Sequence, residues 1–280
     1  TIYLDTCMAV LKDVVNTIQA KHFMIYTWNT KGMPLCKVLC FPLVYNILLT
    51  WNVSLSLCHS VSSLVSSLSL FACSVLIECA NILTSKLVKP SGKDSETGEF
   101  IYKFGDGDDV PKLACYIINT ANYCEENMPK LEENIQNRID DQYKEKIDFE
   151  NAIDSMYDAI TTATKVLASG LHARLQPKLD VMSKTNWVAF TDVGDASNYV
   201  REIYCIVEDI VILCKSILGE IHFGSFCNSF ATLFLKNYVK SIHRCKRIGE
   251  MGAQQLLLDT HEIKSLFLNL REFFVFFNFN

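Results

Sequence analysis

The chain has 280 residues, of which 50% are hydrophobic and 20% charged, and its formal net charge is −5 at pH 7. This length and composition suit one or two folded domains with an apolar core. A cluster of five basic residues without an acid is limited to residues 236–247. Because nucleic-acid-binding proteins present a broader basic surface, we exclude that class of partner.

The twelve cysteines follow neither the pattern of a disulfide scaffold nor that of a metal site. The chain is too long and too poor in cysteine for a small secreted scaffold, and Cys36 and Cys40 have no second pair with which to bind zinc. We therefore expect small buried thiols in a reducing compartment, and no cofactor. Because the sequence starts at Thr1 without an initiator methionine or a signal peptide, we expect a fragment.

Residues 1–32 are predicted to contain an amphipathic helix. Between Ile2 and Phe23 apolar residues recur at intervals of three and four, which is the period of one helical face. These residues are Leu4, Met8, Leu11, Val15 and Ile18.

Residues 33–80 form an uncharged segment rich in serine and leucine. The forty residues 38–77 contain no Asp, Glu, Lys or Arg, which exceeds the roughly 20 residues that span a bilayer. Nine serines between residues 54 and 74 weaken the apolar character of its centre. Three interpretations stay open: a gene-model artefact in which an intron is translated, a membrane anchor at residues 38–77, and a buried insert. The Phe/Asn-rich tail, residues 271–280, raises the same question.

Residues 81–108 are predicted to be a polar linker, and helical periodicity begins at Asp109, which is suited to cap a helix with Pro111 in its first turn. We expect this helix to end near Pro129. The next helix has one continuous apolar stripe that Pro177 bends or ends. The stripe consists of Phe149, Ile153, Met156, Ile160, Ala163, Leu167 and Leu171.

Three more helices are predicted after a turn in which Asp195 or Ser197 serves as the capping residue. The first presents Val200, Ile203, Val207, Ile210 and Cys214 on one face, and the second, 222–245, presents Phe223, Phe226, Phe230 and Phe234. The third, 249–270, presents Leu256, Ile263, Phe267 and Leu270. Strand alternation is absent, so we predict an all-α fold over residues 109–270, as an antiparallel helical bundle or a stacked helical rod.

No pattern in the sequence indicates catalysis. The glycines of Gly105-Asp-Gly107 follow no strand and lack the Lys-Ser/Thr of a phosphate-binding loop. His172, His222 and His261 lie on different predicted helices and form no zinc-binding motif. We therefore predict that the protein is not an enzyme and binds no small-molecule substrate.

One basic stripe is a candidate contact surface. Lys236, Lys240, His243 and Arg247 are spaced by four, three and four residues, which places them on one helical face beside Phe230 and Phe234. Such a stripe docks on an anionic membrane or on an acidic partner. The alternative is a solvated face whose long side chains cover apolar surface.

Several short strings in the carboxy-terminal half resemble one family. They are Asn119-Thr-Ala-Asn-Tyr-Cys124, Met182-Ser-Lys-Thr-Asn-Trp187, Val193-Gly-Asp195, Arg244-Cys245-Lys246 and Gly252-Ala-Gln-Gln-Leu-Leu-Leu-Asp-Thr260. Their content and order resemble the carboxy-terminal part of the vacuolar protein sorting-associated protein 53 family, over about residues 110–270.

The resemblance implies a subunit of the Golgi-associated retrograde protein (GARP) complex, a vesicle tether built from helical rods. It implies sister subunits as partners, together with SNARE proteins and small GTPases, at the cytosolic face of the trans-Golgi network and endosomes. It also implies peripheral membrane contact and transport from endosomes to the Golgi. The alternative is an integral membrane protein anchored by residues 38–77 with a cytosolic helical domain.

Overall fold

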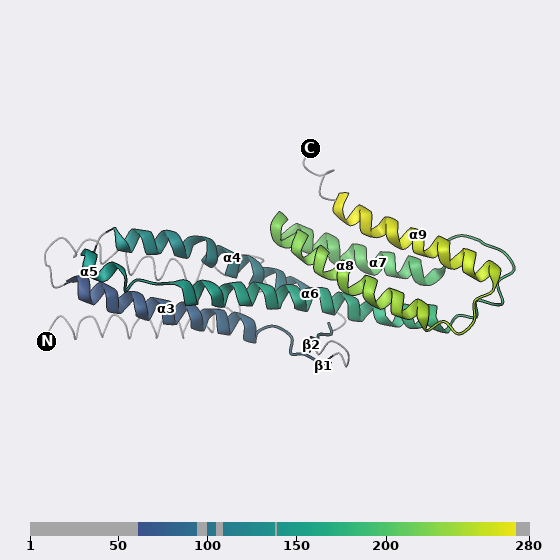
Figure 1. Ribbon diagram of the computed structural model, residues 1–280, viewed down its shortest axis with the longest axis horizontal. Coiled ribbons are helices and arrows are strands. Elements are labelled where there is room, and N and C mark those ends of the chain that lie inside the picture. The colour runs from purple at the N-terminus through teal and green to yellow at the C-terminus, as the bar shows by residue number, and fades with distance from the viewer. Residues whose placement is uncertain (1–60, 94–99, 105–108, 138, 273–280) are drawn as a thin grey trace. The chain divides into compact units, whose positions relative to one another are not determined.

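The computed structural model describes residues 61–93, 100–104, 109–137 and 139–272, and it is almost entirely helical in these ranges (Figure 1). The all-α prediction is confirmed. The helices are α3 (Val61–Ser85), α4 (Asp109–Gln136), α5 (Asp141–Lys144), α6 (Glu150–Lys184), α7 (Asn198–Ile217), α8 (Glu220–His243) and α9 (Glu250–Glu272). The predicted helix within residues 1–32 and most of the tail lie outside the described residues.

The chain divides into two compact units, and α4 and α6 each contribute residues to both. In the first unit, α3 and residues 119–160 bury a core of small and medium apolar side chains. This core includes Leu76, Ala80, Met128, Phe149 and Met156. Gln136 donates from Nε2 to the carbonyl of Ile147 over 3.3 Å, which links the end of α4 to the start of α6.

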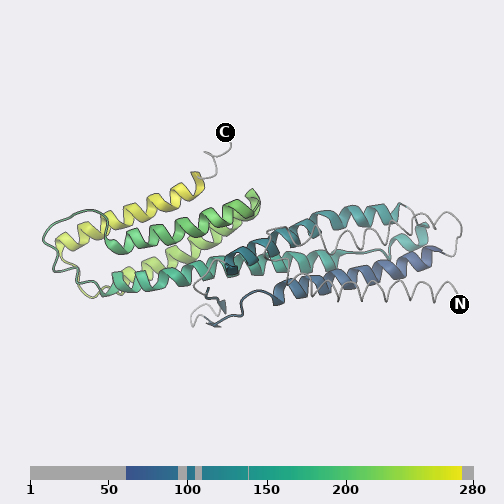
Figure 2. The same ribbon diagram turned by 180° about the vertical axis from the view of Figure 1, so that it is seen from behind.

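In the second unit, α9 packs against α7 and α8, which are joined by a short connection (Figure 2). The predicted phenylalanine face of α8 is its buried face: Phe223, Phe226, Phe230 and Phe234 are at most 2% exposed. Phe267 of α9 stacks on this row, with its ring centroid 4.9 Å from that of Phe234. The apolar faces of α6 and α7 are buried as well, so the helical period of the sequence identified the core.

The predicted polar linker contains a short hairpin that the sequence analysis missed. Strands β1 (Gly92–Lys93) and β2 (Phe100–Ile101) pair antiparallel. The amide of Tyr102 then donates to Ser169 Oγ of α6 over 3.0 Å. A Cβ atom at Gly170 would lie 2.1 Å from the ring of Phe104, so glycine is needed for this close approach. With two residues per strand, alternation is too short to be recognised.

The helix end predicted near Pro129 is wrong, because α4 runs through this residue. Pro177, which was predicted to bend or end its helix, lies inside α6 and does not end it. Both prolines are exposed, so the carbonyl that loses its hydrogen bond faces water. The neighbouring positions, Met128 and Leu179, are fully buried. Their burial offsets part of what each proline costs.

Helix α3 begins inside the predicted uncharged segment, residues 33–80, and continues to Ser85. No helix in the described ranges has both the length and the hydropathy needed to cross a bilayer. Residues 38–60 of the predicted anchor lie outside those ranges, as do Cys36 and Cys40.

We expect His172 of α6 to make the second unit sensitive to acid. Burial lowers the pKa of this imidazole to about 4, with a partial offset from its hydrogen bond to Gln176. Below pH 6.5 the unfolded chain binds a proton that the folded chain binds only near pH 4, so stability falls as the pH is lowered through this window. The melting temperature of His172→Gln should therefore fall less between pH 7 and pH 5 than that of the wild type. His261→Gln, at an exposed position of α9, is the control, and equal losses in all three proteins would contradict the prediction.

Candidate interaction site at the loop end of the second unit

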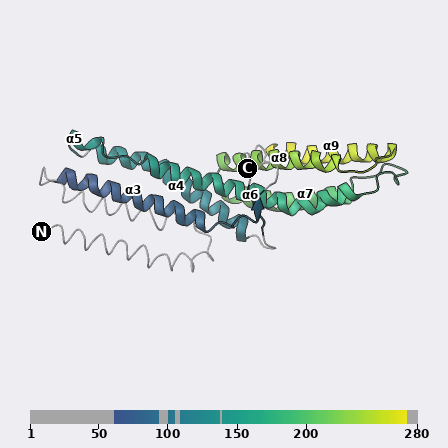
Figure 3. The ribbon, with the colours of Figure 1, turned by 60° about the horizontal axis from the view of Figure 1, so that its bottom comes forward.

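Two loops lie at the same end of helices α6 to α9: residues 185–197 between α6 and α7, and residues 244–249 between α8 and α9 (Figures 1 and 3). We call these two loops the loop end. Four of the five strings that carry the family resemblance lie in or beside it. The fifth, Asn119–Cys124, lies within α4.

Trp187 is the centre of the loop end. Its side chain is 1% exposed, and its indole Nε1 donates to the carbonyl of Met182 over 3.0 Å. Its ring stacks on Phe190 with centroids 5.2 Å apart. The amide of Gly249 donates to the carbonyl of Trp187 over 3.3 Å, which joins the two loops directly.

Gly252 brings the first turn of α9 against the same backbone. A Cβ atom at this position would lie 1.9 Å from the carbonyl oxygen of Trp187. Only glycine permits this approach without a shift of the backbone. Close packing therefore requires glycine at position 252, the first residue of the longest string.

Two buried polar residues of α9 clamp the α6–α7 loop. Gln255 accepts a hydrogen bond from the amide of Gly194 (3.0 Å) and donates to the carbonyl of Asp195 (2.9 Å). Asp259, which is 0% exposed, accepts from the amide of Ser197 at 2.9 Å and from Gln255 Nε2 at 3.2 Å. The carboxylate that caps α7 therefore comes from α9.

The capping residue is one of the two predicted from the sequence, but its side chain is not the acceptor. Ser197 does occupy the N-cap of α7 but makes no side-chain cap bond. Asp195 pairs with Arg201 instead, at 3.3 Å. The signal that could have revealed Gln255 and Asp259 is their i, i+4 spacing beside the apolar stripe of α9, because polar residues at such positions are buried only with partners.

Tyrosines continue this polar cluster into the core. Tyr238 of α8 shares a 3.0 Å hydrogen bond with Thr260, the last residue of the longest string. Burial raises the pKa of Tyr238 and raises that of Tyr199 still further, with the nearby Tyr238 and Asp259 adding to the effect at Tyr199. Both phenols therefore stay protonated, and Tyr238 serves as a structural hydrogen-bonding group through Thr260.

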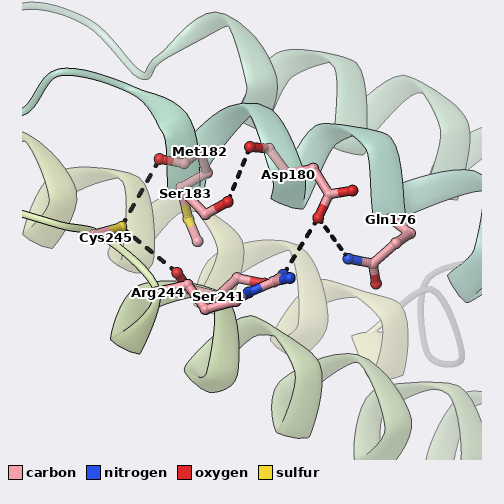
Figure 4. Close-up of polar contacts among 7 residues, drawn as sticks. All are labelled: Gln176, Asp180, Met182, Ser183, Ser241, Arg244 and Cys245. Atoms are coloured by element: carbon pink, nitrogen blue, oxygen red, sulfur yellow. Dashed lines mark hydrogen bonds and ion pairs between the residues drawn. The ribbon is translucent and has the colours of Figure 1, made fainter. Parts of the chain in front are cut away.

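A second polar network ties the end of α8 to α6 (Figure 4). Arg244 Nη2 donates to Asp180 Oδ1 at 3.3 Å and to Ser241 Oγ at 2.9 Å. Gln176 Nε2 donates to the same carboxylate oxygen at 2.9 Å. Cys245 Sγ donates to the carbonyl of Met182 at 3.8 Å. Because the Arg244–Asp180 pair is largely exposed, it contributes at most about 1 kcal/mol and mainly fixes the direction of the loop.

The structure separates the four residues of the predicted basic stripe. Lys236, Lys240 and His243 lie on α8, whereas Arg247 lies in the following loop. The helix ends at His243 because the amides of Arg244 and Cys245 bond to carbonyls three residues back, which tightens the last turn. Lys236 and His243 are exposed and Lys240 is half-buried.

The described residues contain no group of three or more His, Cys, Asp or Glu side chains placed to hold a metal ion. The loop end instead combines buried anchors with a polar and basic exterior. Chemically, such an arrangement is suited to binding another surface.

Comparison with known proteins places this arrangement in a family. The family model for exocyst complex component Sec6 matches residues 60–273, a range that starts inside the uncharged segment and includes α3. Vacuolar protein sorting-associated protein 53 A of Arabidopsis thaliana is 32% identical over 159 residues, which are 57% of this chain and 19% of that relative. The vacuolar protein sorting-associated protein 53 homolog of Caenorhabditis elegans is 31% identical over 160 residues, which are 56% of this chain and 19% of that relative.

The chain thus spans a small part of the length of the curated relatives it matches. No solved structure matches it. The family match covers most of the chain and includes every helix from α3 to α9 in full. The chain therefore belongs to the exocyst complex component Sec6 family, and its relatives confirm the predicted resemblance to the vacuolar protein sorting-associated protein 53 family.

Proposed function

We propose that this chain is part of a non-enzymatic subunit of a vesicle-tethering complex of the GARP type. On this proposal it acts in transport from endosomes to the trans-Golgi network, bound peripherally at the cytosolic face of those membranes. Its partners are sister subunits, with SNARE proteins and small GTPases as further contacts. The observation that carries the proposal is the Sec6 family match over residues 60–273.

The helices supply what a tether requires. A helix of 24 residues such as α8 is about 36 Å long, and its packed apolar face makes it a stiff element. Several weak surfaces on stiff elements add up to strong attachment when two membranes are close. Covalent chemistry has no part in this mechanism.

Affinity capture of the tagged 280-residue chain, followed by mass spectrometry, tests the proposed assembly. We expect sister subunits of the tether to be recovered above the level of a tag-only control. A chain that is folded by circular dichroism yet recovers only what the tag recovers would overturn the proposal.

We expect the basic residues of α8 to contribute to membrane contact. Each Lys or Arg near an anionic bilayer contributes about 1 kcal/mol, so Lys236→Glu with Lys240→Glu should weaken binding to anionic liposomes by roughly 30-fold or more. The matched control is Lys86→Glu with Lys89→Glu, which makes the same charge change at exposed positions far from α8 in the sequence. Equal binding of both double variants would assign α8 to the solvated-face alternative.

A further inference from the structure

Aliphatic side chains are exposed on the loop end. Val188 is 54% exposed and Ile248 is 41% exposed. They come from different loops whose backbones lie close together, since a Cβ atom at Gly249, next to Ile248, would lie 3.3 Å from Val188 Cα. The loop end therefore presents a small apolar surface built from both loops.

The anchors beneath this surface hold it in place. Trp187, next to Val188, is buried and bonded through its indole to Met182. Gly249, next to Ile248, is bonded through its amide to Trp187. The two exposed aliphatic side chains are therefore carried by a backbone that hydrogen bonds hold in place.

Basic residues lie close to the aliphatic pair in the sequence. Lys184, Lys246 and Arg247 are exposed, and residues 236–247 contain five basic residues and no acid. Acidic side chains are present on the same loops, but Asp195 is paired with Arg201. Asp192 and Glu250 are the exposed acids that oppose the basic cluster.

We infer that the loop end inserts Val188 and Ile248 into the surface of an anionic bilayer, with the flanking Lys and Arg side chains contacting the lipid headgroups. This combination of protruding aliphatic and basic side chains is the chemistry of interfacial membrane binding. The inference rests on the proposed tethering function and adds a site of bilayer insertion to it.

Vesicle flotation of the full 280-residue chain tests the inference. The probe is phosphatidylcholine vesicles with or without about 30% phosphatidylserine, the anionic lipid of the cytoplasmic leaflet. We expect binding to the anionic vesicles only, and a loss of about tenfold or more for Val188→Asp with Ile248→Asp. The control, Ile221→Asp with Leu268→Asp, makes the same change at exposed positions at the other ends of α8 and α9, and it should bind like the wild type.

Insertion of the loop end into the bilayer can be measured separately, by tryptophan fluorescence. In Val188→Trp, the added indole should shift to shorter emission wavelength and be quenched by brominated lipids, relative to the wild-type chain under the same conditions. Because both positions are exposed, the variants should fold, and Val188→Ser with Ile248→Ser is a milder pair to use if the aspartates alter the circular dichroism. Failure of quenching would overturn the inference, as would equal binding to vesicles without phosphatidylserine.

Two further outcomes separate this inference from the proposed function. If Lys236→Glu with Lys240→Glu abolishes vesicle binding while Val188→Asp with Ile248→Asp does not, the membrane contact belongs to α8 and the loop-end inference is wrong. If the aspartate pair lowers recovery of sister subunits but leaves vesicle binding unchanged, the loop end is a protein contact and the inference is again wrong. The tethering proposal is overturned only by the capture experiment.

Discussion

Replacement of Gly252 by alanine is expected to destabilise the second unit, although alanine is the better helix former. Helix propensity alone predicts a gain of at most about 1 kcal/mol, the value for an interior position, since Gly252 lies in the first turn of α9. The added Cβ, however, would meet the carbonyl oxygen of Trp187 at 1.9 Å, and a backbone atom cannot rotate away as a side chain does. We expect overpacking to prevail, with a net loss of about 2–3 kcal/mol and a melting temperature lower by roughly 5–10 °C.

Hydrogen exchange measured by mass spectrometry is the sharpest test of this prediction, because it resolves the second unit from the first. Peptides that contain Trp187 and Gln255 should exchange faster in Gly252→Ala than in the wild type. Gly194→Ala is the matched control, since nothing lies within 4 Å of its Cβ position. A Gly252→Ala variant as stable as this control would contradict the close approach of Gly252 to the carbonyl oxygen of Trp187.

Much of the fold could be predicted from the sequence, because the apolar residues that a helix buries recur every three or four positions along the chain. The stripe on α6 is a good case: Leu167 and Leu171 are both fully buried, as their spacing indicates. The phenylalanine row of α8 was equally clear, since large aromatic side chains at steps of three and four have only one face to occupy. These features depend on neighbours within the same helix.

What the local pattern could not predict depends on partners distant in the sequence. Pro129 and Pro177 look like helix ends, but whether a proline ends a helix depends on which side its free carbonyl faces, and that is set by tertiary packing. Arg247 was placed on α8 because the period continues past His243, whereas contacts with α6 redirect the chain there.

The contacts of the loop end also could not be predicted from local patterns, because they join residues that are distant in the sequence. The strings around Trp187, Gly194 and Gly252 were recognised as related to one family, but nothing in the sequence indicated that they touch. Contacts such as that between Gly194 and Gln255 join residues 61 positions apart. The structure shows that these three strings contact one another: Gly249 and Gly252 approach Trp187, and Gln255 bonds to Gly194.

The largest loss of stability is expected at Trp187. Truncation to alanine removes a side chain that is 1% exposed, and removing a buried aromatic residue costs about 3–5 kcal/mol. The variant also loses the 3.0 Å indole bond to Met182 and the stacking partner of Phe190. We therefore expect Trp187→Ala to unfold the loop end before the rest of the second unit, with early exchange of the amides of Ser197 and Gly249.

A second substitution separates packing from hydrogen bonding at this position. Trp187→Phe keeps most of the apolar area but lacks the indole donor, so it should cost about 1–2 kcal/mol, well below the alanine variant. The Met182 carbonyl still receives Cys245 Sγ at 3.8 Å, which limits the penalty for an unsatisfied acceptor. Val188→Ala, one residue further on and exposed, is the control and should stay within about 0.5 kcal/mol of the wild type. If urea unfolding gave Trp187→Ala and Val188→Ala the same midpoint, Trp187 would not be the anchor of the loop end, and the rigid presentation of Val188 and Ile248 would lose its physical basis.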